Sequence, residues 1–417
     1  MTKSGENLLR VDEARLWDTI EASAKIGPGR DQGLRRLALD GSDKVMRDLF
    51  VSWCEAAGFS VTVDGMGNIF ARRAGSDESL APVLIGSHLD TQVTGGRFDG
   101  ILGVLAGLEV LRTLNDHGLE TRRPIEVVNW SNEEGARFNP PMLASAVFAG
   151  LKDKDWAYAR TDNDGITYGE ALKEIGYAGP TPMGGRDLDA YFELHIEQGP
   201  ILEAKGLQIG VVTGGYATRG MRIEVRGETA HSGPTPMDKR RNALVGAAYV
   251  IAAVNDIGWR HHPQLGKTTA SQIDIWPNAT GILPEVAHVT LDLRHPEVSG
   301  AEAMLAEVEA ALEESARKGN VEIEVMERWR FGDESFDPDC VGLLRQAADT
   351  LGYPYLDMQS QAGHDAYNMT HVCPTALLFC PCDGGITHNE AENVSREDAI
   401  PSVNVLLHAV LERANRP

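Results

Sequence analysis

Three short apolar segments in the first half of the chain each end in histidine or acidic side chains. The segment PVLIGSHLD ends in His88 and Asp90. The segment PIEVVNWSNEE ends in Glu133 and Glu134, and AYFELHIEQGP carries His195. Apolar runs of this length are typical of strands buried on both faces of a sheet. Polar residues at the carboxyl ends of several such strands mark the ligand-binding edge of an α/β sheet, so the pattern predicts an α/β domain with a site at that edge.

The residue pattern changes at about Gly214 and changes back near residue 330. Residues 214–329 alternate between strand and helix patterns in the order βαββαβ, which is the order of the split ferredoxin-like unit. A chain of 417 residues also favours two domains, because single cores rarely grow beyond about 250–300 residues. We therefore expect a discontinuous catalytic domain of residues 1–213 and 330–417, with an inserted α+β domain of residues 214–329.

Some local elements can also be predicted. The alternating runs FSVTVDG and GNIFARRAG, joined by a turn rich in glycine, indicate a hairpin. A helix is expected over SDKVMRDLFVSWCEAAG, with Ser42 as its N-cap. Another is expected from residue 299 onward, with Ser299 and Glu302 as a capping box.

Composition excludes several classes of partner. A net charge of −22 repels nucleic-acid phosphates and anionic lipids, so neither is expected to bind. No apolar run is long enough to span a bilayer, and the first residues lack a signal-peptide core, so we expect a cytoplasmic protein. The five cysteines form no C-x-x-C pair, and we expect reduced thiols rather than a thiolate zinc site.

The histidine and acidic residues that follow the predicted strands suit a metal-dependent hydrolase. His88 and Asp90 have the spacing H-x-D, and Asp99 follows a Gly-Gly turn that can fold it back toward His88. Glu133 and Glu134 are adjacent acids, which suits a split role in which one binds metal and the other is a general base. Histidine and carboxylate ligands without thiolate are typical of hydrolytic sites with zinc, manganese, cobalt or nickel.

Two further imidazoles belong to the same pattern. His195 lies in the third apolar segment, and His388 follows the run TALLFC near the end of the chain. Each residue alone has a structural alternative: a buried hydrogen-bonded histidine, a solvated helix start for the paired glutamates, or a turn or cap for Asp99. Their joint occurrence after separate strands favours the metal site.

The motifs that carry these residues resemble those of the hydantoinase/carbamoylase family of amidohydrolases, within the M20 metallopeptidase group. They occur in family order between residues 86 and 392: GSHLDTQVTGGRFDG, NEEGARF, HIEQGP, AHSGPTPM, DLRHP, AGHDA and GITHNEAE. The resemblance implies a zinc-peptidase-like α/β catalytic domain with a mixed sheet, and an inserted ferredoxin-like lid that also dimerises. It covers most of the chain.

The resemblance further implies two divalent ions per subunit, zinc or else manganese, cobalt or nickel. Their ligands would be His88, Asp99, Glu134, His195 and His388. Asp99 would bridge the ions, and His88 and His195 would serve different ions, as would Glu134 and His388.

Other residues take their expected roles from the same resemblance. Asp90 would orient His88, and Glu133 would be the general base that deprotonates a water. His231 would stabilise the oxyanion, and Arg294 would hold the substrate carboxylate through its guanidinium fork. Residues of the lid would enter the partner's site in a homodimer. The remaining expected substrate contacts are Gln198, Asn278, His364 and Gly385.

The sequence departs from the family pattern at two positions. Gly281 stands where the family has an asparagine, and Asn278 is the nearest amide. Cys382 stands where the family has serine. The expected activity is hydrolysis of a C–N bond in a small anionic N-carbamoyl or ureido acid, such as N-carbamoyl-β-alanine or an N-carbamoyl-L-amino acid. An allantoate amidohydrolase, an M20-type peptidase or N-acyl amino acid hydrolase, and a metal-dependent binding protein without catalysis are the alternatives.

Overall fold

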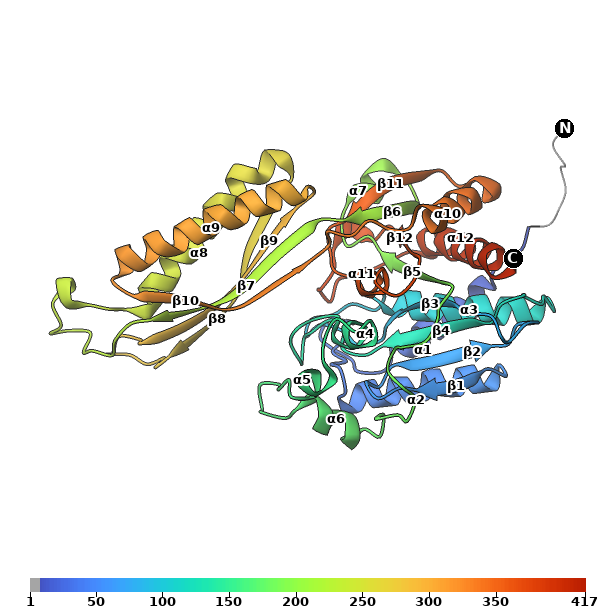
Figure 1. The fold of residues 1–417 in the computed structure, drawn as a ribbon, viewed down its shortest axis with the longest axis horizontal. Coiled ribbons are helices and arrows are strands. Elements are labelled where there is room, and N and C mark those ends of the chain that lie inside the picture. The colour runs from blue at the N-terminus through green and yellow to red at the C-terminus, as the bar shows by residue number, and fades with distance from the viewer. Residues whose placement is uncertain (1–7) are drawn as a thin grey trace. The chain divides into compact units, whose positions relative to one another are not determined.

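The computed structural model describes residues 8–417, which divide into two compact units (Figure 1). The first contains the described residues up to Thr213 and those from Phe336 onward, and the second is Gly214–Ser335. The second unit ends six residues beyond the expected boundary at 329, because its last strand, β10 (Glu322–Phe331), continues past that point.

The first unit is built on an eight-stranded mixed sheet with the order β1-β2-β4-β3-β5-β12-β6-β11. Its strands are β1 (Ser60–Val63), β2 (Ile69–Arg73), β3 (Val83–His88), β4 (Ile125–Trp130), β5 (Ala190–Ile196), β6 (Ile209–Gly215), β11 (Tyr355–Ser360) and β12 (Thr375–Cys380). Strands β4, β3, β5 and β12 are parallel neighbours, whereas β1, β2 and β6 pair antiparallel to theirs. The α/β fold class is confirmed, and the carboxyl ends of four strands meet at one edge.

Helices pack against this sheet. The long helix α3 (Ile101–Asp116) contacts β3, β4 and β5, and α12 (Arg396–Asn415) contacts β3, β5 and β12. Every residue of β3, β4, β5 and β12 is buried, which explains their nearly continuous apolar sequences. The other helices are α1 (Glu13–Ser23), α2 (Gly41–Ala56), α4 (Leu143–Phe148), α5 (Lys154–Tyr158), α6 (Tyr168–Glu174), α7 (Ile201–Lys205), α10 (Pro338–Leu351) and α11 (Asp365–Met369).

The second unit has a four-stranded antiparallel sheet in the order β10-β7-β9-β8. Its other strands are β7 (Ala217–Arg226), β8 (Lys267–Trp276) and β9 (Val286–His295). Along the chain, helix α8 (Ala243–His261) lies between β7 and β8, and helix α9 (Val298–Gly319) lies between β9 and β10. Burial along β9 alternates residue by residue, because one face of the sheet packs on the helices. The chain order β7-α8-β8-β9-α9-β10 is the predicted βαββαβ order.

The predicted hairpin is confirmed, with Val63 opposite Ile69 in the β1–β2 pair. The two predicted helix caps are wrong. Asp40, not Ser42, caps α2 by accepting a hydrogen bond from the N–H of Asp43. Helix α9 begins at Val298 without a side-chain cap, and Glu302 pairs with Arg219 instead.

Within residues 8–417, no helix is both long enough and hydrophobic enough to cross a bilayer.

Candidate metal centre

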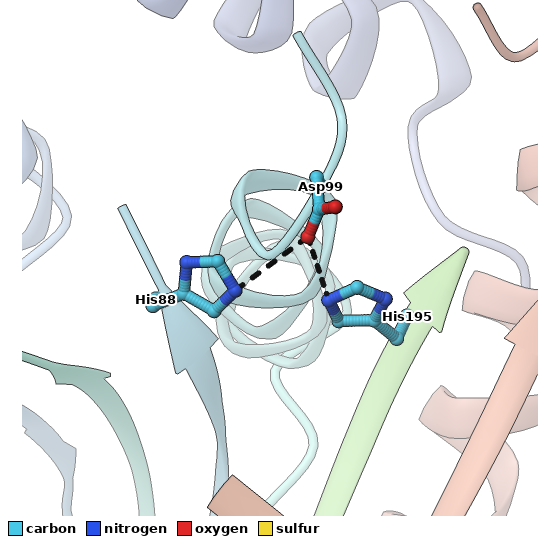
Figure 2. A group of neighbouring side chains, drawn as sticks. All are labelled: His88, Asp99 and His195. Carbon is cyan, nitrogen blue, oxygen red and sulfur yellow. Dashed lines mark ion pairs between the residues drawn. The ribbon is translucent and has the colours of Figure 1, made fainter. Parts of the chain in front are cut away.

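Two strand ends and one helix start bring a first group of ligand atoms together. His88 is the last residue of β3, His195 lies near the end of β5, and Asp99 immediately precedes Gly100 and helix α3. The Nε2 atoms of His88 and His195 lie 3.7 and 3.1 Å from Oδ1 of Asp99 (Figure 2). All three side chains are buried. A Cβ on Gly100 would lie 2.2 Å from Nε2 of His88, so only glycine fits here.

A second group of ligand atoms faces the other oxygen of Asp99. Nε2 of His388 lies 3.5 Å from Oδ2 of Asp99 and 3.3 Å from Oε2 of Glu134. The side chain of His388 is half exposed, whereas that of Glu134 is buried. Asp99 therefore presents one oxygen to each of two potential metal-binding groups. His88 and His195 lie in the same group, and Glu134 and His388 in the other, so the expected separation of each pair onto different ions does not match the geometry.

The buried imidazoles are held by backbone carbonyl groups. Nδ1 of His88 lies 2.9 Å from the carbonyl oxygen of Asp90, and Nδ1 of His195 lies 3.0 Å from that of Ile196. When Nδ1 carries the proton and donates it to these carbonyls, the Nε2 lone pair is free to bind metal. The N–H of Gly100 lies 3.1 Å from Nε2 of His195 and can donate to it once that ring has lost its proton.

Asp90 acts mainly on the two glutamates. Its Oδ1 and Oδ2 accept hydrogen bonds from the backbone N–H groups of Glu133 and Glu134, at 3.2 and 3.3 Å. Its Oδ1 lies 3.9 Å from Nδ1 of His88, whose hydrogen-bond partner is the Asp90 carbonyl. Burial, together with the charges of Asp43 and Glu134, raises the pKa of Asp90 to about 8. The expected contact to His88 is therefore made by the backbone of Asp90, while its carboxylate fixes the neighbouring turn.

Glu133 lies beside the first ligand group. Its Oε2 lies 3.4 Å from Nε2 of His88, next to the first ligand group. Burial, reinforced by the charges of Asp365 and Glu134, raises the pKa of Glu133 well above its usual range. A carboxylate with a raised pKa is a stronger base near neutral pH than an ordinary glutamate.

The electrostatics of the ligands are tightly linked. Burial alone would raise the pKa of Asp99, but His195 and His388 hold it well below its usual range. Burial lowers the pKa of His195, and Asp99 outweighs this and raises it to about 9. The pKa of His388 likewise rises to about 9, because Glu134 and Asp99 outweigh burial.

The residues present fit divalent metal ions. Oε1 of Glu134 is buried and has no hydrogen-bond partner among residues 8–417. A buried carboxylate oxygen without a donor is costly, and a cation beside it would remove that cost. Imidazole nitrogens with carboxylate oxygens, without thiolate, form a donor set that zinc, manganese, cobalt and nickel accept.

Neutral side chains also hold the ligands, and the sequence interpretation missed two of them. Gln92 donates to Oε2 of Glu134 at 2.9 Å, and Thr387 donates to Oδ2 of Asp99 at 2.7 Å. Gln198, expected to contact substrate, donates to the same Oδ2 at 2.8 Å. Gln92 and Thr387 lie inside the quoted motifs, but as uncharged residues they gave no metal-ligand signal.

Two other expected residues of the first unit lie around this group. The ring of His364 is buried 4.5 Å from that of His195, and its Nε2 lies 3.0 Å from Oγ of Ser360. Gly385 has a positive φ of 66°, and a Cβ there would lie 2.5 Å from the backbone of Gly199. Gly385 therefore packs on the turn that follows β5.

The remaining expected residues belong to the second unit. His231 is exposed, and its Nδ1 accepts a hydrogen bond from the N–H of Gly233. Arg294 lies on β9, and its Nε donates to Oδ1 of Asp292 at 2.7 Å. Asn278 is exposed after β8, and Gly281 has a φ of 84° with open space where a Cβ would lie.

Comparison with known proteins agrees with these motifs. The model of Peptidase family M20/M25/M40 matches residues 84–412. The N-carbamoyl-L-amino-acid amidohydrolase of Rhizobium meliloti is 46% identical over 414 residues, which are 99% of each chain. The crystal structure of a hydantoinase/carbamoylase family amidase from Burkholderia vietnamiensis has a TM-score of 0.96 and 48% identity, over 99% of this chain and 100% of that one.

A plant enzyme is similar at lower identity. The allantoate deiminase of Arabidopsis thaliana is 31% identical over 385 residues, covering 84% of this chain and 73% of that protein. The likeness to amidohydrolases thus extends across both units and all the motifs of the site. The chain is a hydrolase of C–N bonds, and it belongs to the peptidase family M20/M25/M40, together with the hydantoinase/carbamoylase amidases.

Proposed function

We propose that this protein hydrolyses the carbamoyl C–N bond of a small N-carbamoyl-L-amino acid, with two divalent ions per subunit. The observation that carries the proposal is the position of Asp99. Its Oδ1 faces His88 and His195, its Oδ2 faces Glu134 and His388, and the relative of 46% identity is an N-carbamoyl-L-amino-acid amidohydrolase. Ions held there would lower the pKa of a water and polarise the scissile carbonyl.

Glu133 is the proton carrier in this proposal. Its carboxylate takes a proton from the attacking water as the oxygen bonds to the carbamoyl carbon. It then returns that proton to the amino-acid nitrogen as the C–N bond breaks. The products are the free amino acid and carbamic acid, which decomposes to carbon dioxide and ammonia. The raised pKa of Glu133 suits both transfers, and Asp90 holds its backbone.

The second unit supplies the charged and proton-donating substrate contacts in this proposal. Arg294 binds the substrate carboxylate by exchanging its pairing with Asp292, and the exposed imidazole of His231 donates to the developing oxyanion. Asn278, His364 and Gly385 are the further substrate contacts that we propose. We further propose that the enzyme is a homodimer, in which His231 and Arg294 of one subunit serve the site of the other.

Allantoate is the second candidate substrate. It is favoured by the similarity to an allantoate deiminase and by Gly281, where open space takes the place of a side chain. Like an N-carbamoyl amino acid, allantoate carries a ureido group and a carboxylate, so the same groups would bind it. A bulkier second ureido arm needs the room that an asparagine at position 281 would fill.

A comparative assay distinguishes these substrates. Metal-free protein is reconstituted separately with manganese, cobalt, nickel and zinc. Ammonia or amine release is then followed with N-carbamoyl-L-amino acids, N-carbamoyl-β-alanine, allantoate, N-acetyl amino acids and dipeptides. The highest kcat/KM is expected for an N-carbamoyl-L-amino acid. A preference for allantoate would select the second candidate, and cleavage of dipeptides alone would overturn both.

A further inference from the structure

A buried acid outside the ligand set lies against the backbone of Asp99. Glu392, in the segment that connects β12 to α12, is 2% exposed. Its Oε1 accepts hydrogen bonds from the N–H groups of Phe98 and Asp99, at 2.9 and 3.0 Å. The residue thus satisfies two backbone donors at the point where the chain turns into α3, and it fixes the position from which the Asp99 side chain extends.

The glycine at position 96 makes this approach possible. A Cβ on Gly96 would lie 2.1 Å from Cδ of Glu392 and 2.2 Å from its Oε1. The φ of Gly96 is not positive, so backbone conformation does not require glycine here. The absence of a side chain is needed because the carboxylate of Glu392 occupies that space.

The same segment carries His388, and its contacts join the two ligand-bearing regions. Thr387 donates to Oδ2 of Asp99, and its hydroxyl also lies 3.2 Å from Oε2 of Glu392. Thr94 donates to the carbonyl oxygen of His388 at 3.0 Å. Unlike the histidines of β3 and β5, which sheet pairing holds, His388 lies on an irregular segment between β12 and α12.

A second buried acid close to Asp99 lowers the stability of the fold unless its hydrogen bonds compensate for the repulsion. Two carboxylates in a buried region repel each other, and burial removes both from water. The backbone N–H groups of Phe98 and Asp99 offset that cost only while Glu392 keeps its present position. This argues for a specific positioning task rather than for simple packing.

We propose that Glu392 is a positioning residue that sets Asp99 and His388 at the spacing required for the ion on the Oδ2 side. The inference rests on the two-ion site proposed above. Without Glu392, the backbone N–H groups of Phe98 and Asp99 lose their acceptor, and Thr387 alone links Oδ2 of Asp99 to the segment of His388. Because His88 and His195 remain fixed by their strands, the ion on the Oδ1 side keeps most of its ligands. Glu392 therefore controls mainly the second ion.

The test is a cobalt titration of metal-free full-length protein, followed by calorimetry and by visible absorption of the bound ion. Wild-type protein is expected to bind two equivalents. Glu392→Ala is expected to weaken one equivalent by about 10- to 100-fold, as loss of partners behind metal ligands commonly does, and to change its absorption band. The other equivalent should change by less than about threefold.

Three companion variants make the result specific. Glu392→Gln keeps an oxygen that can accept both N–H groups, and it should restore much of the lost affinity. Gly96→Ala leaves Glu392 in the chain but fills its space, and it should reproduce the loss; combining it with Glu392→Ala should add little. Glu390→Ala is the matched control, because Glu390 lies in the same segment but pairs with the exposed Arg30.

The outcomes separate the two proposals. Fewer than two equivalents in the wild type would overturn the two-ion site itself, and the role of Glu392 with it. If the wild type binds two equivalents, either of two results would overturn the role of Glu392 alone. In the first, Glu392→Ala binds both equivalents with unchanged affinity. In the second, Glu390→Ala weakens binding as much as Glu392→Ala does. If Glu392→Ala does not fold, Gly96→Ala decides: unchanged affinity for both equivalents in that variant overturns the inference.

Discussion

The carboxylate of Asp90 holds the backbone of Glu133, because its Oδ1 accepts the N–H of that residue at 3.2 Å. Its Oδ2 accepts the neighbouring N–H of Glu134 at 3.3 Å. A single aspartate just after β3 thus aligns the proposed base and a proposed ligand, which lie just after β4. The H-x-D spacing serves the site through these two bonds more than through the contact between Asp90 and His88.

Asp90→Asn tests this alignment. An asparagine has only one oxygen, so either Glu133 or Glu134 faces an NH₂ group that cannot accept its N–H. We expect kcat to fall by about 10- to 100-fold with a smaller change in KM, because the loss concerns alignment rather than substrate binding. Steady-state kinetics on the metal-loaded protein measure both constants. A changed KM with unchanged kcat would contradict the assigned role.

Glu133→Gln tests the proposed proton carrier. The amide is nearly isosteric and cannot take a proton from water, so kcat should fall by at least about 100-fold, the lower end for loss of a general base. The metal content, measured by elemental analysis, should stay at the wild-type level because Glu133 is not among the ligands. Activity close to that of wild type would exclude Glu133 as the base.

Metal binding should release protons. In metal-free protein, the pKa values of His195 and His388 are about 9, so both imidazoles are charged at pH 7.5 and must lose their protons to bind metal. We expect about two protons released when both ions bind. Calorimetry in buffers of different ionisation enthalpy counts these protons. Release of no protons at pH 7.5 would contradict the raised pKa values.

The same pKa values predict the pH dependence of stability. The pKa of each of these histidines is higher in the folded protein than in the unfolded chain, where it is about 6.5. This difference stabilises the metal-free fold, and its full contribution is present below about pH 6.5. This contribution is lost as pH rises through about 9, the folded pKa of His195 and His388. Over the same range, metal affinity should rise. Thermal unfolding with and without metal between pH 6.5 and 9 should show the gap in Tm widening.

Arg294→Ala tests recognition of the substrate carboxylate. We expect KM to rise by about tenfold or more for carboxylate-bearing substrates, because a charge-assisted hydrogen bond contributes about 1.5–3 kcal/mol. Amide analogues without a carboxylate should be affected much less. Arg260→Ala is the matched control, since Arg260 lies in the same unit and forms an exposed ion pair with Glu307. An equal effect on neutral analogues would show that Arg294 does not bind the carboxylate.

Much of this fold can be predicted from residue patterns. The buried strands β3, β4 and β5 were predictable because apolar runs ended in His88, Glu133 and His195, and the second unit was predictable from its regular alternation. The helix starts were not. Asp40 caps α2 instead of Ser42, since both residues suit an N-cap and only the backbone conformation decides between them.

The site shows a similar division. Residue types and motifs identified the side chains that the structure brings around Asp99. They did not identify the pairing of His88 with His195, because that depends on which oxygen of Asp99 faces which strand end. Glu392 was also missed, since its partners are backbone N–H groups, which every residue but proline carries.

The most direct test of the two-ion proposal is the anomalous scattering of manganese in crystals of the metal-loaded protein. Two peaks are expected, about 3.5–4 Å apart as in other two-metal hydrolytic sites. One should lie next to His88 and His195, the other next to Glu134 and His388, each bound to a different oxygen of Asp99. A single peak at full occupancy, or two peaks that Asp99 does not bridge, would contradict the proposed centre.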